Sequence, residues 1–126
     1  MKVIKLSSGS DGNLTYIETE HTRILMDAGL SCKEVESRLS LLGVTGSDLD
    51  GIVVTHEHSD HIKGVDVFSK KYNLPVYAHN DVWATLYNKL SKVSDNNKKI
   101  FTETFAIKDL VINPVEIPHD VKCFGY

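Results

Sequence analysis

The chain has 126 residues, 41% of them hydrophobic and 25% charged, with 14 basic side chains against 17 acidic ones and a net charge of −3. This balance predicts one compact domain and argues against a uniformly basic nucleic-acid-binding protein, while leaving room for a local basic patch. No apolar run approaches the roughly 20 residues that span a bilayer, and the N-terminus alternates in polarity instead of forming a signal peptide. Two widely separated cysteines, Cys32 and Cys123, suit a reducing compartment. We therefore expect a cytoplasmic protein without a membrane partner.

The first third of the chain contains three segments in which apolar and polar residues alternate, the pattern of half-buried strands. These segments are residues 2–6, 14–18 and 23–26. Small and turn-forming residues from Ser7 to Asn13 predict a loop between the first two, and a hairpin or meander is the simplest arrangement of the rest. A helix follows, because Ser31 and Glu34 have capping-box spacing and apolar residues recur at helical intervals until Gly43.

Strands and helices alternate through the remainder of the chain. The β-branched segment 51–55 predicts a strand buried on both faces, and helical spacing predicts a helix over 61–72 that Asn73 closes. Asn80 is expected to cap a further helix through Leu90. Further strands are predicted at residues 74–78, 100–102, 105–107 and 110–115. This order indicates an α/β (α+β) fold without an internal linker.

The densest group of metal-capable side chains is His56-x-His58-x-Asp60-His61, at the end of the strand predicted over 51–55. At the composition of this chain, that pattern arises by chance roughly once in a thousand sequences. His56 and His58 project to the same side and can bind one metal, whereas Asp60 and His61 turn toward a neighbouring position. One loop can therefore supply two cations about 3.5–4 Å apart. A capping role for Asp60 would not explain three histidines within six positions.

Other candidate residues have two readings each. Asp27 either orients a ligand histidine from behind or begins the turn at Gly29. His119 follows a strand-like run, and an isolated histidine is more often structural than a ligand. The small residues from Ser8 to Asn13 could present backbone N–H groups to an anion, although no Gly-Lys-Ser/Thr sequence follows as in a P-loop.

These residues resemble the metallo-β-lactamase-fold hydrolase superfamily. The match consists of the His56 to His61 motif after a hydrophobic strand, Asp27-x-Gly29 before it, and His119 about sixty residues later. The loop from Ser8 to Asn13, together with residues 55–64, is most similar to the bacterial YycJ (WalJ) branch and related phage-encoded proteins, which is associated with phosphodiester and DNA exonuclease chemistry. The resemblance implies a metal-dependent hydrolase whose partner is DNA or another phosphodiester. Thioesters, lactones and lactams are the alternative substrate classes.

The resemblance also implies a role for each candidate residue. Two divalent cations, zinc first and manganese or iron as alternatives, would activate a hydroxide that Asp60 holds in line as the catalytic carboxylate. The implied ligands are His56, His58 and His119 for the first metal, and Asp60 and His61 for the second. Asp27 would orient a ligand, and the loop residues implied to contact phosphate oxygens are Ser8, Ser10 and Asn13.

In the superfamily, a bridging aspartate and a final histidine complete the metal site, and both are expected beyond Tyr126. The fold that the resemblance implies is a four-layer αββα sandwich, of which residues 1–126 would form the N-terminal half of a single, C-terminally truncated domain. One sheet face is then expected to lack a partner within the chain, so the rest of a longer protein or a second copy in a homodimer would cover it. The rival hypothesis is a non-catalytic metal-binding half-domain that self-associates. Lys63, Lys70 and Lys71 form either a local basic face or an ordinary solvated helix surface.

Overall fold

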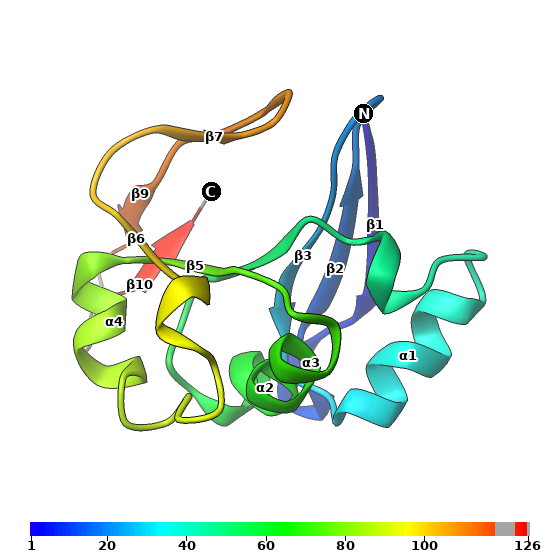
Figure 1. The fold of residues 1–126 in the computed structure, drawn as a ribbon, viewed down its shortest axis with the longest axis horizontal. Coiled ribbons are helices and arrows are strands. Elements are labelled where there is room, and N and C mark those ends of the chain that lie inside the picture. Colours follow the sequence, from blue (N-terminus) through cyan, green and yellow to red (C-terminus); the bar gives the residue numbers. More distant parts are fainter. Residues whose placement is uncertain (118–122, 126) are drawn as a thin grey trace.

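The computed structural model describes residues 1–117 and 123–125, and its centre is a six-stranded sheet in the order β1-β2-β3-β4-β5-β6 (Figure 1). β1, β2 and β3 are antiparallel neighbours, whereas β3, β4, β5 and β6 run parallel. The sheet strands are β1 (Lys2–Ser7), β2 (Leu14–Glu18), β3 (Arg23–Ala28), β4 (Gly51–Val54), β5 (Val76–His79) and β6 (Lys98–Phe101). Two antiparallel pairs follow, formed by β7 (Phe105–Ile107) with β8 (Leu110–Ile112) and by β9 (Val115–Ile117) with β10 (Cys123–Gly125).

The helices gather on one side of the sheet, at the bottom of Figure 1. They are α1 (Cys32–Ser40), α2 (Ser59–Ile62), α3 (Val65–Tyr72) and α4 (Asn80–Leu86), with short 3₁₀ helices η1 (Gly9–Asp11), η2 (Gly46–Asp48) and η3 (Asp95–Asn97) in the connections. Among the described residues, none of the helices has the length and hydrophobicity needed to cross a bilayer.

Most predicted elements form where the residue pattern places them. α1 begins after Ser31, whose hydroxyl accepts a hydrogen bond from the backbone N–H of Glu34 (3.3 Å), as the capping-box spacing predicts. β4 is buried along its whole length because it lies between two parallel neighbours and is covered on both faces. α3 ends at Asn73, which adopts the left-handed conformation (φ 53°) typical of a helix terminus. The mixed α/β class is therefore confirmed.

The single helix predicted over 61–72 is wrong, because α2 and α3 are separate helices that meet at Gly64. A Cβ atom at Gly64 would lie only 2.1 Å from the carbonyl oxygen of Leu30, so the backbone there packs directly on the connection between β3 and α1. The N–H of Gly64 also donates to the carbonyl of Ala28 (2.8 Å). This tertiary contact separates the two helices at Gly64, a break that helical periodicity alone does not predict.

Two further boundaries differ from the prediction. α4 is capped by His79, whose Nδ1 accepts from the N–H of Asp81 (3.1 Å), and not by Asn80. It ends at Leu86 rather than Leu90, because the chain tightens there into a turn. The strand predicted over 110–115 is split into β8 and β9 at Pro114, which has no N–H to donate to a neighbouring strand.

The main core lies between the sheet and the helices. Its largest fully buried side chains are Tyr16, Phe68, Leu14, Leu25, Leu39, Ile52 and Leu86. A second, smaller cluster lies on the other face, where the hairpin of β7 and β8 packs onto the sheet. It consists of Ile17, Ile24 and Val53 from the sheet with Ile107, Leu110 and Ile112 from the hairpin. At about 1.5–3 kcal/mol for each fully buried aliphatic side chain, this contact stabilises the docked hairpin by several kcal/mol.

The expectation that one sheet face lacks a partner within the chain is therefore wrong in part, since the hairpin covers a portion of it. The remaining portion is apolar and open: Val3 and Val111 are 59% and 65% exposed, beside an apolar cavity of about 320 Å³. The cavity is lined by Met1, Val3, Thr15, Ile17, Ile24, Met26, Leu110, Val111 and Ile112.

Asp109 fastens the hairpin to the turn between β2 and β3. Its carboxylate accepts hydrogen bonds from the hydroxyls of Thr19 and Thr22 and from the backbone N–H of His21 (3.2 Å). The hydrogen bonds from Thr19 and then Thr22 stabilise the charged form and lower the pKa of Asp109 to about 2. The ionised carboxylate therefore holds together two turns that are distant in the sequence.

We predict that Asp109→Ala destabilises the fold above pH 4 and that this effect disappears in acid. The folded-state pKa of about 2 is below the unfolded value of 3.8, so the carboxylate's contribution is fully present above about pH 4 and is lost as the pH falls toward 2. Urea unfolding of the wild type and the variant from pH 7 downward measures this difference. Glu103→Ala, at an exposed carboxylate in the loop before β7, serves as the control. A stability difference that is independent of pH would contradict the assignment.

Candidate metal centre

The candidate site lies where the parallel strands β3 and β4 end next to each other. Their pairing sets Met26 opposite Val53, so the residues that follow, Asp27 and Thr55, meet at the same edge of the sheet. Both oxygens of the buried Asp27 carboxylate accept from Thr55: Oδ1 from the backbone N–H (2.8 Å) and Oδ2 from the hydroxyl (2.6 Å). Asp27 has a left-handed backbone (φ 62°), at a cost of about 1–2 kcal/mol. Hydrogen bonds to a charged group, at about 1.5–3 kcal/mol each, offset this cost.

This network fixes the orientation of two histidine rings. Nδ1 of His61 lies 2.7 Å from Oδ2 of Asp27, and a carboxylate only accepts, so this nitrogen donates. Nδ1 of His56 lies 2.7 Å from the hydroxyl oxygen of Thr55, whose hydrogen is already given to Asp27, so Nδ1 of His56 donates too. Each ring is then left with its lone pair on Nε2. Orientation of a ring nitrogen by a hydrogen bond from behind is the usual arrangement around metal-binding histidines.

The three residues Asp27, His56 and His61, here called the metal cluster, place candidate ligand atoms within 4.8 Å of one another. The ring centroids of the two histidines are 4.3 Å apart. The hydrogen bonds to both oxygens of Asp27 favour a role in orienting the rings, and they leave the imidazole Nε2 atoms available to bind a metal. Imidazole and carboxylate donors suit zinc, manganese and iron alike, so the residues fit a divalent cation.

Asp60 and His58 extend the metal cluster toward solvent. Oδ2 of Asp60 lies 3.9 Å from Nε2 of His61, and two atoms that each bind one ion at about 2.1 Å are at most about 4.2 Å apart. These two donors can therefore share a cation. The side chain of His58 is 48% exposed, its Nε2 lies 3.5 Å from Oε1 of Glu57, and its ring centroid is 6.2 Å from that of His56.

The half-buried rings of His56 and His61 differ in their affinity for protons. Burial, and then the neighbouring His61, lower the pKa of His56 below its ordinary value. Burial also acts against the charged form of His61, but the hydrogen bond to Asp27 and the nearby carboxylates of Asp27, Asp60 and Glu57 outweigh it and raise the pKa. At a given pH, His61 is therefore protonated in a larger fraction of molecules than His56. A cation that binds His61 must displace this proton.

Close backbone contacts hold the start of α2 against the end of β3. The backbone N–H of Asn13 donates to the carbonyl of Asp60 (2.7 Å), and its side-chain amide donates to the same carbonyl (3.1 Å) and lies 3.3 Å from Nε2 of His61. A Cβ atom at Gly29 would lie 1.8 Å from the Asp60 carbonyl oxygen, so only glycine permits this approach. The N–H of Gly29 in turn donates to the carbonyl of Asn13 (2.9 Å).

The structure thus brings Asp27, His56 and His61 into contact, with Asp60 beside them and His58 at the rim. Of the other predicted site residues, Ser8 is exposed in the same loop as Asn13, while the side chain of Ser10 and all of His119 lie outside what the structure describes. Thr55 is a further residue of the site, and it was not predicted from the sequence. Its position directly before His56, at the end of a buried strand, is the signal that could have indicated a supporting hydroxyl.

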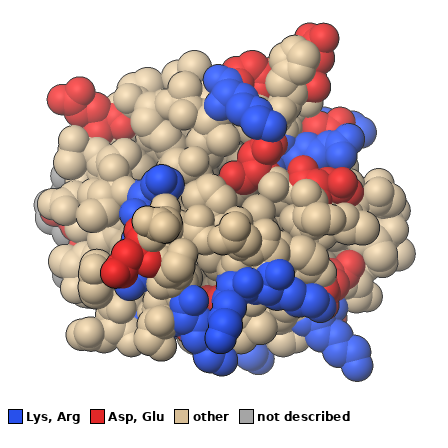
Figure 2. Space-filling view, viewed as in Figure 1, with Lys and Arg blue, Asp and Glu red and all other residues tan. Residues whose placement is uncertain are grey.

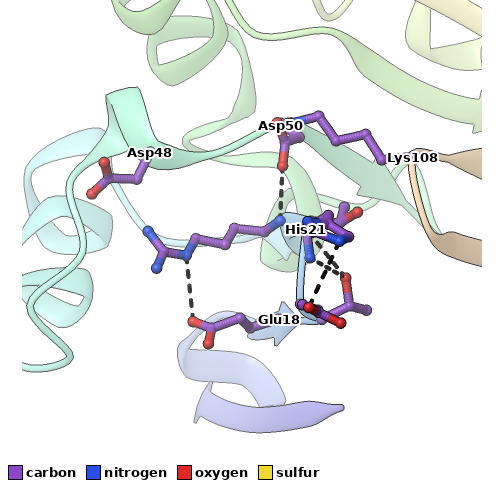
Figure 3. A pocket seen from close by; sticks show the side chains of 9 residues that line it. Glu18, His21, Asp48, Asp50 and Lys108 are labelled. Atoms are coloured by element: carbon purple, nitrogen blue, oxygen red, sulfur yellow. Dashed lines mark hydrogen bonds and ion pairs between the residues drawn. The ribbon is translucent and has the colours of Figure 1, made fainter.

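A second polar cavity, of about 300 Å³, lies at the opposite ends of β3 and β4 (Figure 3). It is lined by Glu18, Thr19, Glu20, His21, Thr22, Arg23, Asp48, Asp50 and Lys108. Four carboxylates stand against two basic side chains here, and two of the carboxylates are paired with them: Nζ of Lys108 lies 2.7 Å from Asp50, and Nε of Arg23 lies 3.4 Å from Glu18. The described residues of this cavity therefore contain two ion pairs and an excess of negative charge.

A mixed sheet whose parallel strands end in a histidine-rich loop, with helices on one face, is the half-sandwich of the metallo-β-lactamase fold. The chain superimposes on the FEZ-1 metallo-β-lactamase of Legionella gormanii with a TM-score of 0.74 at 14% sequence identity, over 98% of this chain and 56% of that one. The family model described as the Metallo-beta-lactamase superfamily matches residues 8–122. The chain therefore belongs to the metallo-β-lactamase superfamily.

Two curated relatives are more similar in sequence. The exodeoxyribonuclease WalJ of Streptococcus pneumoniae is 43% identical over 121 residues, which are 91% of this chain and 44% of that protein. The exodeoxyribonuclease YycJ of Bacillus anthracis is 40% identical over 119 residues, again 91% and 44%. The chain thus spans less than half the length of these relatives.

We predict that Thr55→Val weakens metal binding by about 10- to 100-fold, the usual effect of removing a group that orients a metal ligand. Valine keeps the shape of threonine but removes the hydroxyl that Asp27 and His56 share. Titration with zinc in the presence of a competing chelator measures the affinity, and thermal unfolding checks that the fold is intact. Thr102→Val, at an exposed threonine outside the site, is the matched control. Equal zinc affinity in the wild type and Thr55→Val would contradict this role.

Proposed function

We propose that the chain carries the metal-binding half of a metal-dependent phosphodiesterase that degrades DNA from an end. The observation that carries the proposal is the network of Asp27 and Thr55, which orients the rings of His56 and His61 and leaves the Nε2 atom of each ring available to a metal. The sequence similarity to two exodeoxyribonucleases supports DNA as the substrate.

Each residue has a distinct task in this proposal. His56, His58 and His119 would hold one cation, and Asp60 with His61 would hold a second, with zinc as the first choice and manganese or iron as alternatives. Such cations would supply a lower pKa for bound water and would offset the negative charge of the phosphodiester. Asp60 accepts a hydrogen bond from the attacking water and keeps it in line with the phosphorus atom. Asp27 keeps the His61 ring in a single orientation throughout.

The proposed metal centre includes two further ligands. A bridging aspartate and a further histidine would come from additional sequence or from a second copy that covers the open apolar face beside Val3 and Val111. The competing candidates are a self-associating metal-binding half-domain and a hydrolase of thioesters, lactones or lactams, because the fold alone does not select a substrate. A cytoplasmic location, where DNA is available, is part of the same proposal.

We predict that the full-length protein digests DNA only with bound metal, and that Asp60→Asn lowers the rate at least about a hundredfold. Asparagine keeps the size of the side chain but loses the negative charge that binds the cation and orients water. Release of nucleotides from labelled DNA, before and after chelation and with zinc or manganese added back, measures both effects. Asp95→Asn, at an exposed aspartate in η3, is the control. Full activity in chelator, or hydrolysis of lactones or thioesters without hydrolysis of DNA, would contradict the proposal.

The loop of Ser8, Ser10 and Asn13 is proposed to contact the phosphates of the substrate. Asn13 is a poor probe, because its amide also holds Asp60 in place. Ser8 is exposed and has no such contact, so we predict that Ser8→Trp raises KM for DNA severalfold and leaves metal content unchanged. Steady-state kinetics beside Ser37→Trp, an exposed position on α1, measures this. An unchanged KM would remove the loop from the substrate site.

A further inference from the structure

Four exposed lysines surround the helices that support the metal motif: Lys33, Lys63, Lys89 and Lys92. Lys33 lies in the first turn of α1, Lys63 directly follows α2, and the other two lie after α4. In Figure 2, lysine and arginine side chains gather along the lower edge of the molecule, over the region where α1, α2 and α3 lie in Figure 1. Positive charge is thus concentrated on the side of the fold that carries the site.

Contacts between the underlying segments place these lysines in one arc. A Cβ atom at Gly64 would lie 3.3 Å from the backbone nitrogen of Cys32, so the residues next to them, Lys63 and Lys33, lie on touching segments. The backbone N–H of Lys92 donates to Oδ1 of Asp66 (2.8 Å), which places this residue against the first turn of α3.

The arc ends at the metal motif itself. Nζ of Lys89 donates to the backbone carbonyl of Glu57 (3.1 Å), the residue between His56 and His58. An ammonium group has three donors, and this bond uses one of them. Lys89 therefore supports the loop of metal ligands and still carries N–H groups that can bind an anion.

The charges of this arc are not neutralised within the fold. In the part of the chain that the structure describes, Lys33, Lys63 and Lys92 form no ion pair, whereas Lys71 is paired with Glu36 (2.6 Å). Asp66 lies beside Lys92, where its carboxylate accepts the backbone N–H of that residue. Lys33 also sits at a helix N-terminus, where the helix dipole disfavours positive charge. Lys33 therefore does not stabilise the fold through its position in the helix or through a salt bridge among the described residues.

We propose that Lys33, Lys63, Lys92 and Lys89 form a track that binds the phosphodiester backbone of a DNA strand and leads it to the metal motif. A polyphosphate backbone neutralises such an arc and releases its own counterions, which gives salt-dependent affinity without base specificity. The inference rests on the proposed function and adds the surface by which the substrate is held. Lys71 is not part of the track, because Glu36 already neutralises it.

The test uses the full-length protein and a labelled DNA strand with phosphorothioate linkages, which keep the backbone charge and resist hydrolysis. The triple variant Lys33→Gln/Lys63→Gln/Lys92→Gln removes three positive charges but leaves the bond from Lys89 to the metal loop intact. The matched control, Lys2→Gln/Lys5→Gln/Lys99→Gln, removes the same charge from exposed lysines on the edge strands β1 and β6. Affinity is measured across a range of salt concentrations, and hydrolysis of bis(p-nitrophenyl) phosphate reports on the metal site without the track.

We expect the triple variant to bind DNA at least tenfold more weakly at about 0.1 M salt. The slope of log affinity against log salt falls by about 2, since each lost contact to a single strand accounts for about 0.7. Hydrolysis of the small phosphodiester stays unchanged, and the control variant binds like the wild type. An equal loss of DNA affinity in the triple variant and the control would refute the track. In that case, digestion of DNA by the wild type would still support the proposed function. A wild-type protein that neither binds nor digests DNA would refute both the track and the proposed function. That result needs only the wild-type protein.

Discussion

The carboxylate of Asp27 is the contact on which the site depends. It lies at the end of β3, yet its two oxygens take the N–H and hydroxyl of Thr55 from the end of β4 and Nδ1 of His61 from α2. A buried carboxylate with missing partners costs several kcal/mol, so these segments are stable only when they meet in this arrangement. The parallel pairing of β3 with β4 sets the register that makes the meeting possible. The strained backbone at Asp27 is the local cost of directing one side chain toward two other segments.

The same arrangement is reinforced from the main chain. At Gly29 and Gly64, backbone approaches backbone so closely that any Cβ atom would collide with a carbonyl oxygen. Asn13 closes the arrangement by donating twice to the carbonyl of Asp60. Main-chain contacts cannot relax by a change of rotamer, so the orientation of His61 is determined by the fold before any cation arrives. A ligand ring that is already oriented loses little conformational entropy on binding, which favours tight binding of a metal.

The sequence predicted the parts of this structure that depend on local pattern. The strands, the cap of α1 at Ser31 and the position of the histidine motif after a buried strand all follow from the spacing of residue types. The split at Gly64 could not be predicted, because it arises from contact with Leu30, and periodicity contains no information about that neighbour. The role of Thr55 and the hydrogen bonds of Asn13 to Asp60 could not be predicted for a similar reason. Their partners are 28 and 47 residues away, and only the strand register and the docking of α2 bring them together.

A net charge of −3 conceals an uneven distribution along the sheet. At the end of β3 and β4 away from the site, Lys108 is paired with Asp50 and Arg23 with Glu18, and acidic side chains outnumber basic ones among the residues that line the cavity there. At the end near the metal motif, Lys33 and Lys63 are left without such partners among the described residues. A field of this kind attracts a polyanion from a distance, whereas a small neutral lactam or lactone responds to it very little. Within a superfamily whose fold accepts many substrates, the distribution of unpaired charge is therefore an argument for the phosphate backbone that we propose as the substrate.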